Sequence, residues 1–232
     1  MAKGKKYIQS VEGYERGKLY PLEDAVKVLK TFPARNFNET VELSMNLGID
    51  GRHADQILRG TVMLPHGTGK EMNVLVITQG ELVGAAQEAG ADLVGGAELV
   101  EKIQQGWLDF DIVIASPDMM GQVGKLGRIL GPRGLMPNPK TGTVTQDIAQ
   151  AVQEAKAGRV EFRADSKSGN NAQAPIGKLS FDEPALVANA RVFNDAIMRA
   201  KPASAKGQFV RKMVISSTMG PGVRIDPAMV AA

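Results

Sequence analysis

Two segments of the chain come close to a glycine- and lysine-containing loop that binds phosphates. Residues 134–141 read Gly-Leu-Met-Pro-Asn-Pro-Lys-Thr, close to the loop Gly-x-x-x-x-Gly-Lys-Ser/Thr, but Pro139 stands where the second glycine belongs. That loop works by pointing backbone N–H groups at phosphates, and proline has none. The second segment, Gly67-Thr-Gly-Lys70, has Leu64 and Glu71 where glycine and Ser/Thr are required. Neither segment therefore predicts nucleotide hydrolysis.

Other catalytic and metal-binding patterns are equally weak. No G-x-G-x-x-G follows an expected strand, no histidine-centred nucleophile pattern occurs, and no carboxylate pair is marked by its setting. The chain has no cysteine, and its two histidines, His53 and His66, offer little for a histidine-rich metal site, although composition leaves carboxylate sites open. We therefore expect no catalytic residues, no cofactor and no metal, and predict that the protein is not an enzyme.

A row of polar residues is better suited to bind RNA. Apolar and polar residues alternate from Thr40 to Ile49, which is typical of a strand with one buried face. The polar face, Thr40, Glu42, Ser44 and Asn46, offers donors and acceptors to base edges or ribose hydroxyls, unless it is only a solvated surface. Phe37, just before this row, could stack on a base or could plug the edge of the core.

Two further stretches could contact a nucleic acid. Arg163, Lys167 and Lys178, together with Gly169, form a basic patch rich in turn residues. The turn Thr218-Met219-Gly220-Pro221 is uncharged, and its backbone could approach a ribose closely, although a plain turn explains it equally well.

The stretch Gly121–Gly142 combines six glycines, three prolines and four basic residues with no acid. Interleaved apolar residues argue against a flexible linker, so we predict a short basic helix followed by an ordered loop that ends near 137–139. An ordered basic loop without carboxylates suits a nucleic acid backbone. A loop whose glycines only satisfy backbone geometry is the alternative, and both remain open at this point.

Charge is distributed unevenly along the chain. Residues 70–120 hold nine acids and two bases, a net charge of −7, whereas the remaining residues hold 26 bases and 16 acids, a net charge of +10. The middle segment therefore repels a polyanion and its flanks attract one, as expected of two units of which one binds nucleic acid. An uneven solvated surface is the simpler alternative.

Secondary-structure patterns also change near residues 68 and 159. The outer segments predict half-exposed strands at 40–49, 59–64, 160–163, 174–179 and 208–217, helices beginning at Pro21 and Asp182, an irregular arm over 1–20 and a short tail over 223–232. The middle segment predicts apolar strands at 73–77, 92–94 and 110–115 and helices at 81–89, 97–105 and 148–157. Alternating strands and helices indicate a parallel sheet covered on both faces.

These patterns predict an α/β protein with two domains. Residues 1–68 and 159–232 form a discontinuous α+β domain with an antiparallel sheet, and 69–158 form an inserted Rossmann-like domain with a mostly parallel sheet. Since no apolar run has spanning length and the basic start lacks a signal-peptide core, we expect a cytoplasmic protein that does not bind membranes.

Four motifs in order resemble the family of large-subunit ribosomal protein L-one, the protein of the mobile ribosomal stalk. They are G-K-L-G-R-I-L-G-P-R-G-L-M-P-N-P-K-T-G (124–142), V-E-F-R-A-D-S-K-S-G-N (160–170), I-G-K (176–178) and S-T-M-G-P-G-V-R (217–224). The lysine-rich opening and Y-P-L-E-D-A-V are also similar to bacterial members. Asn36 departs from the lysine of some relatives, and Ser-Lys-Ser-Gly at 166–169 departs from the commoner Lys-Thr-Gly.

The resemblance implies a split first domain, an inserted second domain and a function that composition cannot show. It implies binding of the stalk helices of large-subunit rRNA, help in releasing deacylated tRNA from the exit site, and repression of translation by binding the mRNA of the protein's own operon. It implies a monomer within the large ribosomal subunit.

Carried over by motif, the resemblance places the principal RNA surface on the terminal domain and not on the glycine-rich stretch. The implied RNA-binding residues are Phe37, Thr40, Glu42, Ser44, Arg163, Asp165, Lys167, Gly169, Gly177, Lys178, Thr218, Met219 and Gly220. The bases of the inserted domain that would face tRNA are Lys125, Arg128, Arg133 and Lys140.

Two rival functions come from other classes. A nucleotide-dependent enzyme would use the parallel domain, but fold alone is weak evidence of chemistry. A DNA-binding protein would tolerate a deoxy version of the same hairpin, whereas an RNA-binding protein that reads the 2′-hydroxyl would not.

Overall fold

The computed structural model describes residues 4–50, 53, 56–80, 82–165 and 170–230. The chain divides into two compact units, and each is described separately. The first combines Met1–Gly69 with Val160–Ala232, and the second is Lys70–Arg159. Both contain helices and strands, but the sheet of the first is antiparallel and that of the second is parallel, so the predicted α/β class is confirmed.

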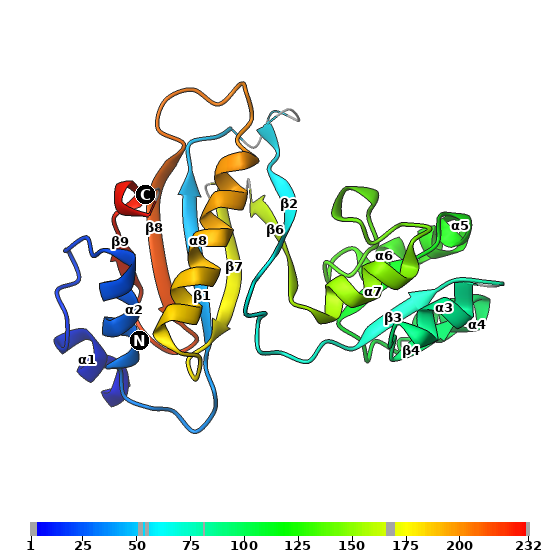
Figure 1. The fold of residues 1–232 in the computed structure, drawn as a ribbon, viewed down its shortest axis with the longest axis horizontal. Helices are drawn as coiled ribbons and strands as arrows, with labels where there is room; N and C mark the ends of the chain where they lie inside the picture. Colours follow the sequence, from blue (N-terminus) through cyan, green and yellow to red (C-terminus); the bar gives the residue numbers. More distant parts are fainter. Residues whose placement is uncertain (1–3, 51–52, 54–55, 81, 166–169, 231–232) are drawn as a thin grey trace. The chain divides into compact units, whose positions relative to one another are not determined.

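The first unit is built on a six-stranded sheet in the order β2-β6-β7-β1-β8-β9 (Figure 1). Its strands are β1 (Thr40–Leu47), β2 (Arg59–Met63), β6 (Arg159–Asp165), β7 (Asn171–Lys178), β8 (Val210–Ser217) and β9 (Val223–Ile225). Its helices are α1 (Lys5–Glu12), α2 (Leu22–Lys30), α8 (Glu183–Arg199) and the short 3₁₀ helix η5 (Pro227–Met229). β1 is a central strand, antiparallel to both β7 and β8.

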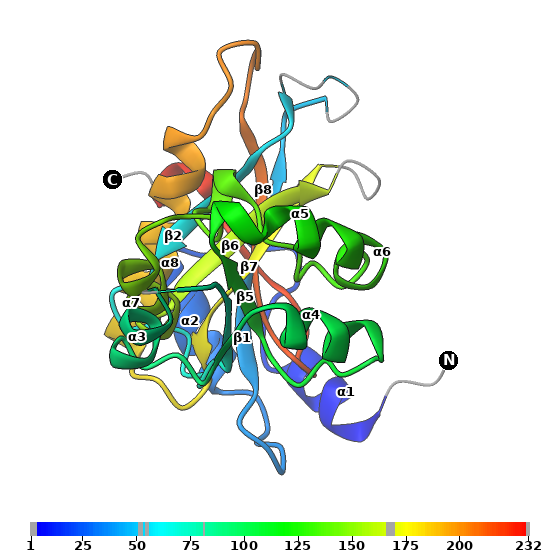
Figure 2. The same ribbon diagram turned by 90° about the vertical axis from the view of Figure 1, so that its right-hand side faces the viewer.

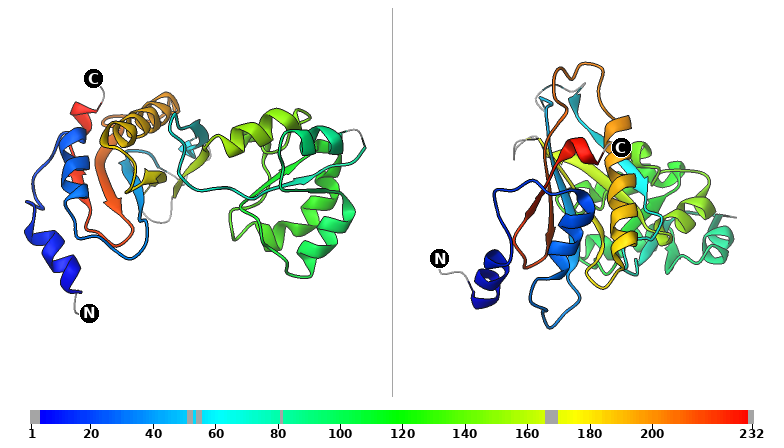
Figure 3. Two further views of the ribbon diagram at one scale, coloured as in Figure 1. Left: turned by 60° about the horizontal axis from the view of Figure 1, so that its bottom comes forward. Right: turned by 60° about the vertical axis from the view of Figure 1, so that its left-hand side comes forward.

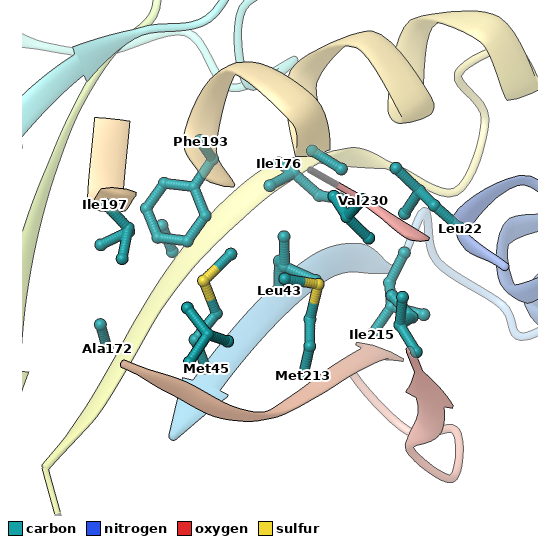
Figure 4. Packing of buried hydrophobic residues seen from close by; sticks show 14 of the residues in the cluster. Leu22, Leu43, Met45, Ala172, Ile176, Phe193, Ile197, Met213, Ile215 and Val230 are labelled. Atoms are coloured by element: carbon teal, nitrogen blue, oxygen red, sulfur yellow. The ribbon is translucent and has the colours of Figure 1, made fainter. Parts of the chain in front are cut away.

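One face of this sheet is covered by α2 and α8, which lie side by side (Figure 3). β1 alternates between buried and more exposed residues along its whole length, as its sequence predicts. Its buried side chains meet those of α8 between the layers (Figure 4), and they form one core together with residues of the other strands. This core includes Leu22, Leu43, Met45, Ala172, Ile176, Phe193, Ile197, Met213, Ile215 and Val230.

The two covering helices begin where local chemistry favours it. Pro21 precedes α2, and Glu23 and Asp24 lie in its first turn, where the helix dipole favours acids. Pro184 lies in the first turn of α8, where the missing N–H costs no helical hydrogen bond. Both predicted starts are confirmed.

Two predictions for the first unit are wrong. Residues 1–20 are not only an irregular arm, because Lys5–Glu12 form α1 between Gly4 and Gly13. This eight-residue run contains no helix breaker, and the Ser10 hydroxyl is buried and donates a hydrogen bond to the Lys6 carbonyl oxygen at 2.8 Å.

The residues after 222 are likewise more than a tail. Val223–Ile225 form β9, which is antiparallel to β8 and adds a sixth strand. Tyr20 bridges to Ile225 on its other side, and the Tyr20 N–H donates to the Arg224 carbonyl oxygen at 3.0 Å. Residues from both ends of the chain therefore close this edge of the sheet.

The second unit is a three-stranded parallel sheet in the order β4-β3-β5. Its strands are β3 (Val74–Ile77), β4 (Leu93–Gly95) and β5 (Ile112–Ala115). Its helices are α3 (Leu82–Glu88), α4 (Ala97–Gln104), η2 (Pro117–Met119), α5 (Met120–Val123), η3 (Gly124–Leu126), α6 (Gly127–Leu130), η4 (Pro139–Thr141) and α7 (Ile148–Lys156).

Helices cover both faces of the parallel sheet, as the apolar strands predict (Figure 2). Leu75 and Ile77 pack in one cluster with residues of α4, α5 and η3, whereas Val74 and Val76 pack in another with residues of α3 and α7. All four residues of β3 are buried, because alternate side chains enter opposite layers.

The stretch 121–142 begins as helical turns and then becomes an ordered loop, as predicted. Val123, Leu126 and Leu130 point into the core, and the loop returns through the buried Pro137. It ends at Gly142, whose φ of 66° lies in the left-handed region that favours glycine. Within the described part of the chain, no helix is long and apolar enough to cross a membrane.

Replacing Asp92 should alter the acid stability of the second unit. The hydrogen bond from the Val74 N–H at 2.8 Å, with the Lys156 ammonium at 3.2 Å, holds the pKa of Asp92 below its ordinary value of 3.8. A carboxyl with a lowered folded pKa contributes stability above its unfolded pKa and loses it as pH falls through the folded pKa. Asp92→Asn should therefore be less stable than wild type at neutral pH.

The difference should shrink as pH falls from about 4, where the unfolded carboxyl becomes protonated, through the lower pKa of the folded carboxyl. Urea unfolding across a pH series measures it, with Asp109→Asn, at an exposed aspartate of the same unit, as the control. A gap between Asp92→Asn and wild type that is the same at pH 3 and pH 7 would contradict the assignment.

Candidate nucleic-acid interface

The face of the six-stranded sheet turned away from α2 and α8 is polar. On β1 it presents Thr40, Glu42, Ser44 and Asn46, the half-buried or exposed positions of the alternation. The strand register adds polar neighbours on β7, β8 and β9, namely Lys178, Gln173, Ser216, Lys212 and Arg224. Thr40 and Asn46 are six residues apart, so this open face extends about 20 Å along β1 at roughly 3.3 Å per residue.

One end of the open face carries a hydrogen-bonded cluster from three strands. The Lys178 ammonium donates to the Thr40 hydroxyl oxygen at 2.8 Å. The Thr40 N–H donates to the Thr218 hydroxyl oxygen at 3.1 Å, and the Thr218 N–H donates to the Thr40 carbonyl oxygen at 3.1 Å. The end of β7, the start of β1 and the end of β8 therefore meet in a fixed arrangement, although Thr40 and Thr218 lie 178 positions apart in sequence.

Two large apolar side chains close in sequence to Thr40 and Thr218 are exposed. Phe37 is 53% exposed and Met219 is 54% exposed. Exposed aromatic side chains can stack on nucleic acid bases, and an exposed methionine offers apolar surface. The exposure of Phe37 excludes the alternative that it plugs the edge of the core.

The turn that carries Met219 has little freedom. The Gly220 N–H donates to the Ser217 carbonyl oxygen at 3.1 Å, and a Cβ added at Gly220 would lie 2.5 Å from the Ser217 hydroxyl oxygen. A larger residue at Gly220 would therefore require the Ser217 hydroxyl, and the Phe32 ring at 3.2 Å, to shift. The Met219 N–H donates to a carboxylate oxygen of Glu39 at 2.8 Å.

Gly177 is buried and does not lie on the open face. Its φ is 151°, and an added Cβ would come within 2.9 Å of side-chain atoms of Phe181 and Leu186. β7 shifts register against β1 between Val41 and Glu42, next to this glycine. The close packing around this position explains why it is a glycine. A direct RNA contact by Gly177 stays a prediction.

Arg163 and Asp165 are exposed near the end of β6. Asp165 is opposite Asn171, and Asn171 is opposite Asn46, whose side-chain amide donates to it at 2.8 Å. Arg163 and Asp165 therefore lie toward one end of the open face, and the Thr40 and Thr218 cluster lies at the other end. Lys167 and Gly169, also predicted to bind RNA, lie outside the described residues.

The structure adds residues that sequence reasoning missed. Lys212 and Ser216 lie opposite Asn46 and Glu42, and Arg224 lies opposite Val214. The alternation of β8 was available as a signal for the first two. Arg224 closes the motif 217–224, but its place on this face could not be predicted because β9 was not expected.

The bases predicted to face tRNA belong to the second unit. Lys125, Arg128, Arg133 and Lys140 are all exposed, and the chain has no acid between Asp118 and Asp147. Among the described residues, no group of three histidine, aspartate or glutamate side chains is placed to hold a metal ion.

An open polar sheet face, with basic residues and two exposed apolar side chains, is a surface typical of nucleic-acid-binding proteins. Residues 29–221 match the model of the Ribosomal protein L1p/L10e family, and the chain belongs to this family. It is therefore a ribosomal protein with a structural, rRNA-binding role in the large subunit, in a family of RNA-binding proteins and not of enzymes. α1 and β9 lie outside the matched residues.

Lys178→Met should weaken binding to RNA in general. The substitution removes one ammonium from the open face but keeps the apolar stem, so RNAs of different sequence should lose affinity alike. The slope of log affinity against log salt should become shallower by about 0.7 to 0.9, the value for one phosphate contact. Filter binding across a salt series measures this slope.

Lys27→Met is the matched control, because Lys27 is an exposed lysine on α2, which covers the other face of the sheet. It should leave affinity and slope unchanged. An equal effect of both substitutions would show that only net charge matters and that the open face is not the binding surface.

Proposed function

We propose that this protein forms the mobile stalk of a bacterial large ribosomal subunit by binding the stalk helices of its rRNA. The discontinuous domain, 1–68 with 159–232, supplies the RNA-binding surface. The observation that carries this proposal is the hydrogen-bonded cluster of Thr40, Lys178 and Thr218 at one end of an open polar face. The family membership supports rRNA as the ligand.

The chemistry of the open face suits RNA more than DNA. Hydroxyl and amide groups can exchange hydrogen bonds with ribose 2′-hydroxyls, which A-form RNA displays in its wide minor groove. Lys178 supplies charge for a phosphate, and Phe37 and Met219 offer apolar surface to an unstacked base. Glu42, an acid on this face, repels phosphates and accepts hydrogen bonds, so it favours a donor at that position.

Stalk motion in this proposal helps deacylated tRNA leave the exit site. The acidic segment 70–120 disfavours rRNA, whereas the exposed bases Lys125, Arg128, Arg133 and Lys140 offer charge to tRNA. The same open face also binds a stalk-like structure in the mRNA of the protein's own operon, and this binding represses translation. A single RNA site serving both targets makes the two activities mutually exclusive.

Binding of purified protein to a stalk-sized pair of rRNA hairpins tests the function. We expect tight binding that survives competing tRNA and homopolymer RNA and is lost with a deoxy version of the hairpins. Thr218→Ala and Met219→Ala should fold normally and weaken hairpin binding by about tenfold each, the effect of losing one good contact. If any RNA displaces the hairpins, the protein has only a nonspecific basic surface and the proposed recognition of rRNA is wrong.

A separate experiment tests the tRNA partner. Arg128→Ala together with Arg133→Ala should slow release of deacylated tRNA from ribosomes reassembled with the variant, while hairpin binding stays as in wild type. Lys102→Ala, at an exposed base within the acidic segment, is the control. Unchanged release in the double variant would remove these residues from the tRNA surface.

A further inference from the structure

A buried carboxylate lies directly beneath the exposed end of the open face. Glu39 immediately precedes β1 and is only 3% exposed. Burying a charged carboxylate is costly unless it is paired and hydrogen-bonded. Neither the sequence patterns nor the residues carried over by motif assign Glu39 a role, so its burial needs a physical reason.

The contacts of Glu39 connect three segments of the chain. One carboxylate oxygen accepts the Met219 N–H at 2.8 Å, and the other lies 3.8 Å from the side-chain Nε of Arg35. The carbonyl oxygen of Glu39 accepts the Leu179 N–H at 2.8 Å. The loop before β1, the segment after β7 and the turn after β8 are therefore held at one residue.

The neighbouring residue strengthens the same connection. The Asn38 side-chain amide donates to the Ser180 hydroxyl oxygen at 2.9 Å, and its carbonyl oxygen accepts the Ser180 N–H at 3.3 Å. Phe37 precedes Asn38 and is exposed to solvent, as is Met219 in the turn after β8. Both exposed apolar side chains are thus carried by segments that Glu39 links.

We propose that Glu39 is a positioning residue that presents Phe37 and Met219 as a preformed apolar pair for one RNA nucleotide. Arg35 is its counter-ion. Glu39 itself does not touch RNA, because its carboxylate is buried and would repel phosphates. This inference rests on the proposed RNA-binding function and names a residue on which the shape of that site depends.

A preformed pair lowers the cost of ordering side chains and turns when RNA binds. The lower ordering cost increases affinity for an RNA whose shape matches the pair. It does not change the number of phosphates that the protein neutralises, which sets the dependence on salt. Loss of Glu39 should therefore reduce discrimination between RNAs and leave the salt slope intact, whereas loss of Lys178 should reduce the slope.

The experiment compares Glu39→Ala, Glu39→Gln and wild type by two measurements. Hydrogen exchange of the Met219 amide in the free protein reports whether the turn is held. Binding of the rRNA hairpin pair and of a homopolymer RNA, each across a salt series, reports discrimination. Glu23→Gln is the matched control, because it removes an acid from an ion pair with Arg191 on the helices that cover the other face.

For Glu39→Ala we expect faster exchange at Met219 and about tenfold or greater loss of hairpin affinity, the size expected for a hydrogen bond to a charged group. Homopolymer affinity and both salt slopes should match wild type. Glu39→Gln retains an acceptor for the Met219 N–H, so its values should lie between those of wild type and Glu39→Ala. Glu23→Gln should behave as wild type.

Unchanged exchange at Met219 in Glu39→Ala, or equal losses of hairpin and homopolymer affinity, would overturn the positioning role. If Glu39→Ala does not fold, Glu39→Gln and Arg35→Met decide by the same two measurements, and wild-type values in both variants overturn the role. A wild-type protein that does not prefer the hairpin would instead overturn the proposed function, while exchange at Met219 still tests what Glu39 holds.

Discussion

The first unit depends on the one-sided burial of its six-stranded sheet. α2 and α8 cover one face, so alternate residues of each strand enter the core and the others face outward. In β1, Leu43 and Met45 are core residues while Glu42 and Ser44 belong to the open face. A register slip of one residue would exchange the two sets. The same pairing therefore sets both the stability of this unit and the chemistry of its open face, the proposed RNA surface.

Sequence periodicity predicted most of the fold, because it is strong wherever a strand or helix is long. β1, α2, α8 and the buried parallel strands all carry clear patterns. β9 was missed because three residues are too few for alternation to stand out, and its strand character comes from pairing with β8. α1 was missed because glycines at both ends made a short helical run resemble an irregular arm.

The candidate site was harder to predict than the fold, because its parts converge only through strand pairing. Polarity alone suggested Thr40 and Glu42, but placing Lys178 and Thr218 beside them requires the register of β1 with β7 and β8. Residue chemistry suggested Lys178 and Thr218 as separate candidates, and resemblance to a family joined them to one RNA surface without geometry. It also included Gly177, which is buried, and did not include Glu39, whose burial no local pattern predicts.

The sequence separation between contacting residues determines when each unit can fold during synthesis. The second unit is continuous, so its contacts can form once residue 159 has been made and has left the ribosome. The contact between Thr40 and Thr218 spans 178 positions and cannot form until residue 218 has been made. A nascent protein that stops before residue 217 would contain the complete second unit, but it would lack Thr218 and therefore the hydrogen-bonded cluster at the start of β1. If the proposed site binds rRNA, this binding would therefore become possible only after residue 218 has been made.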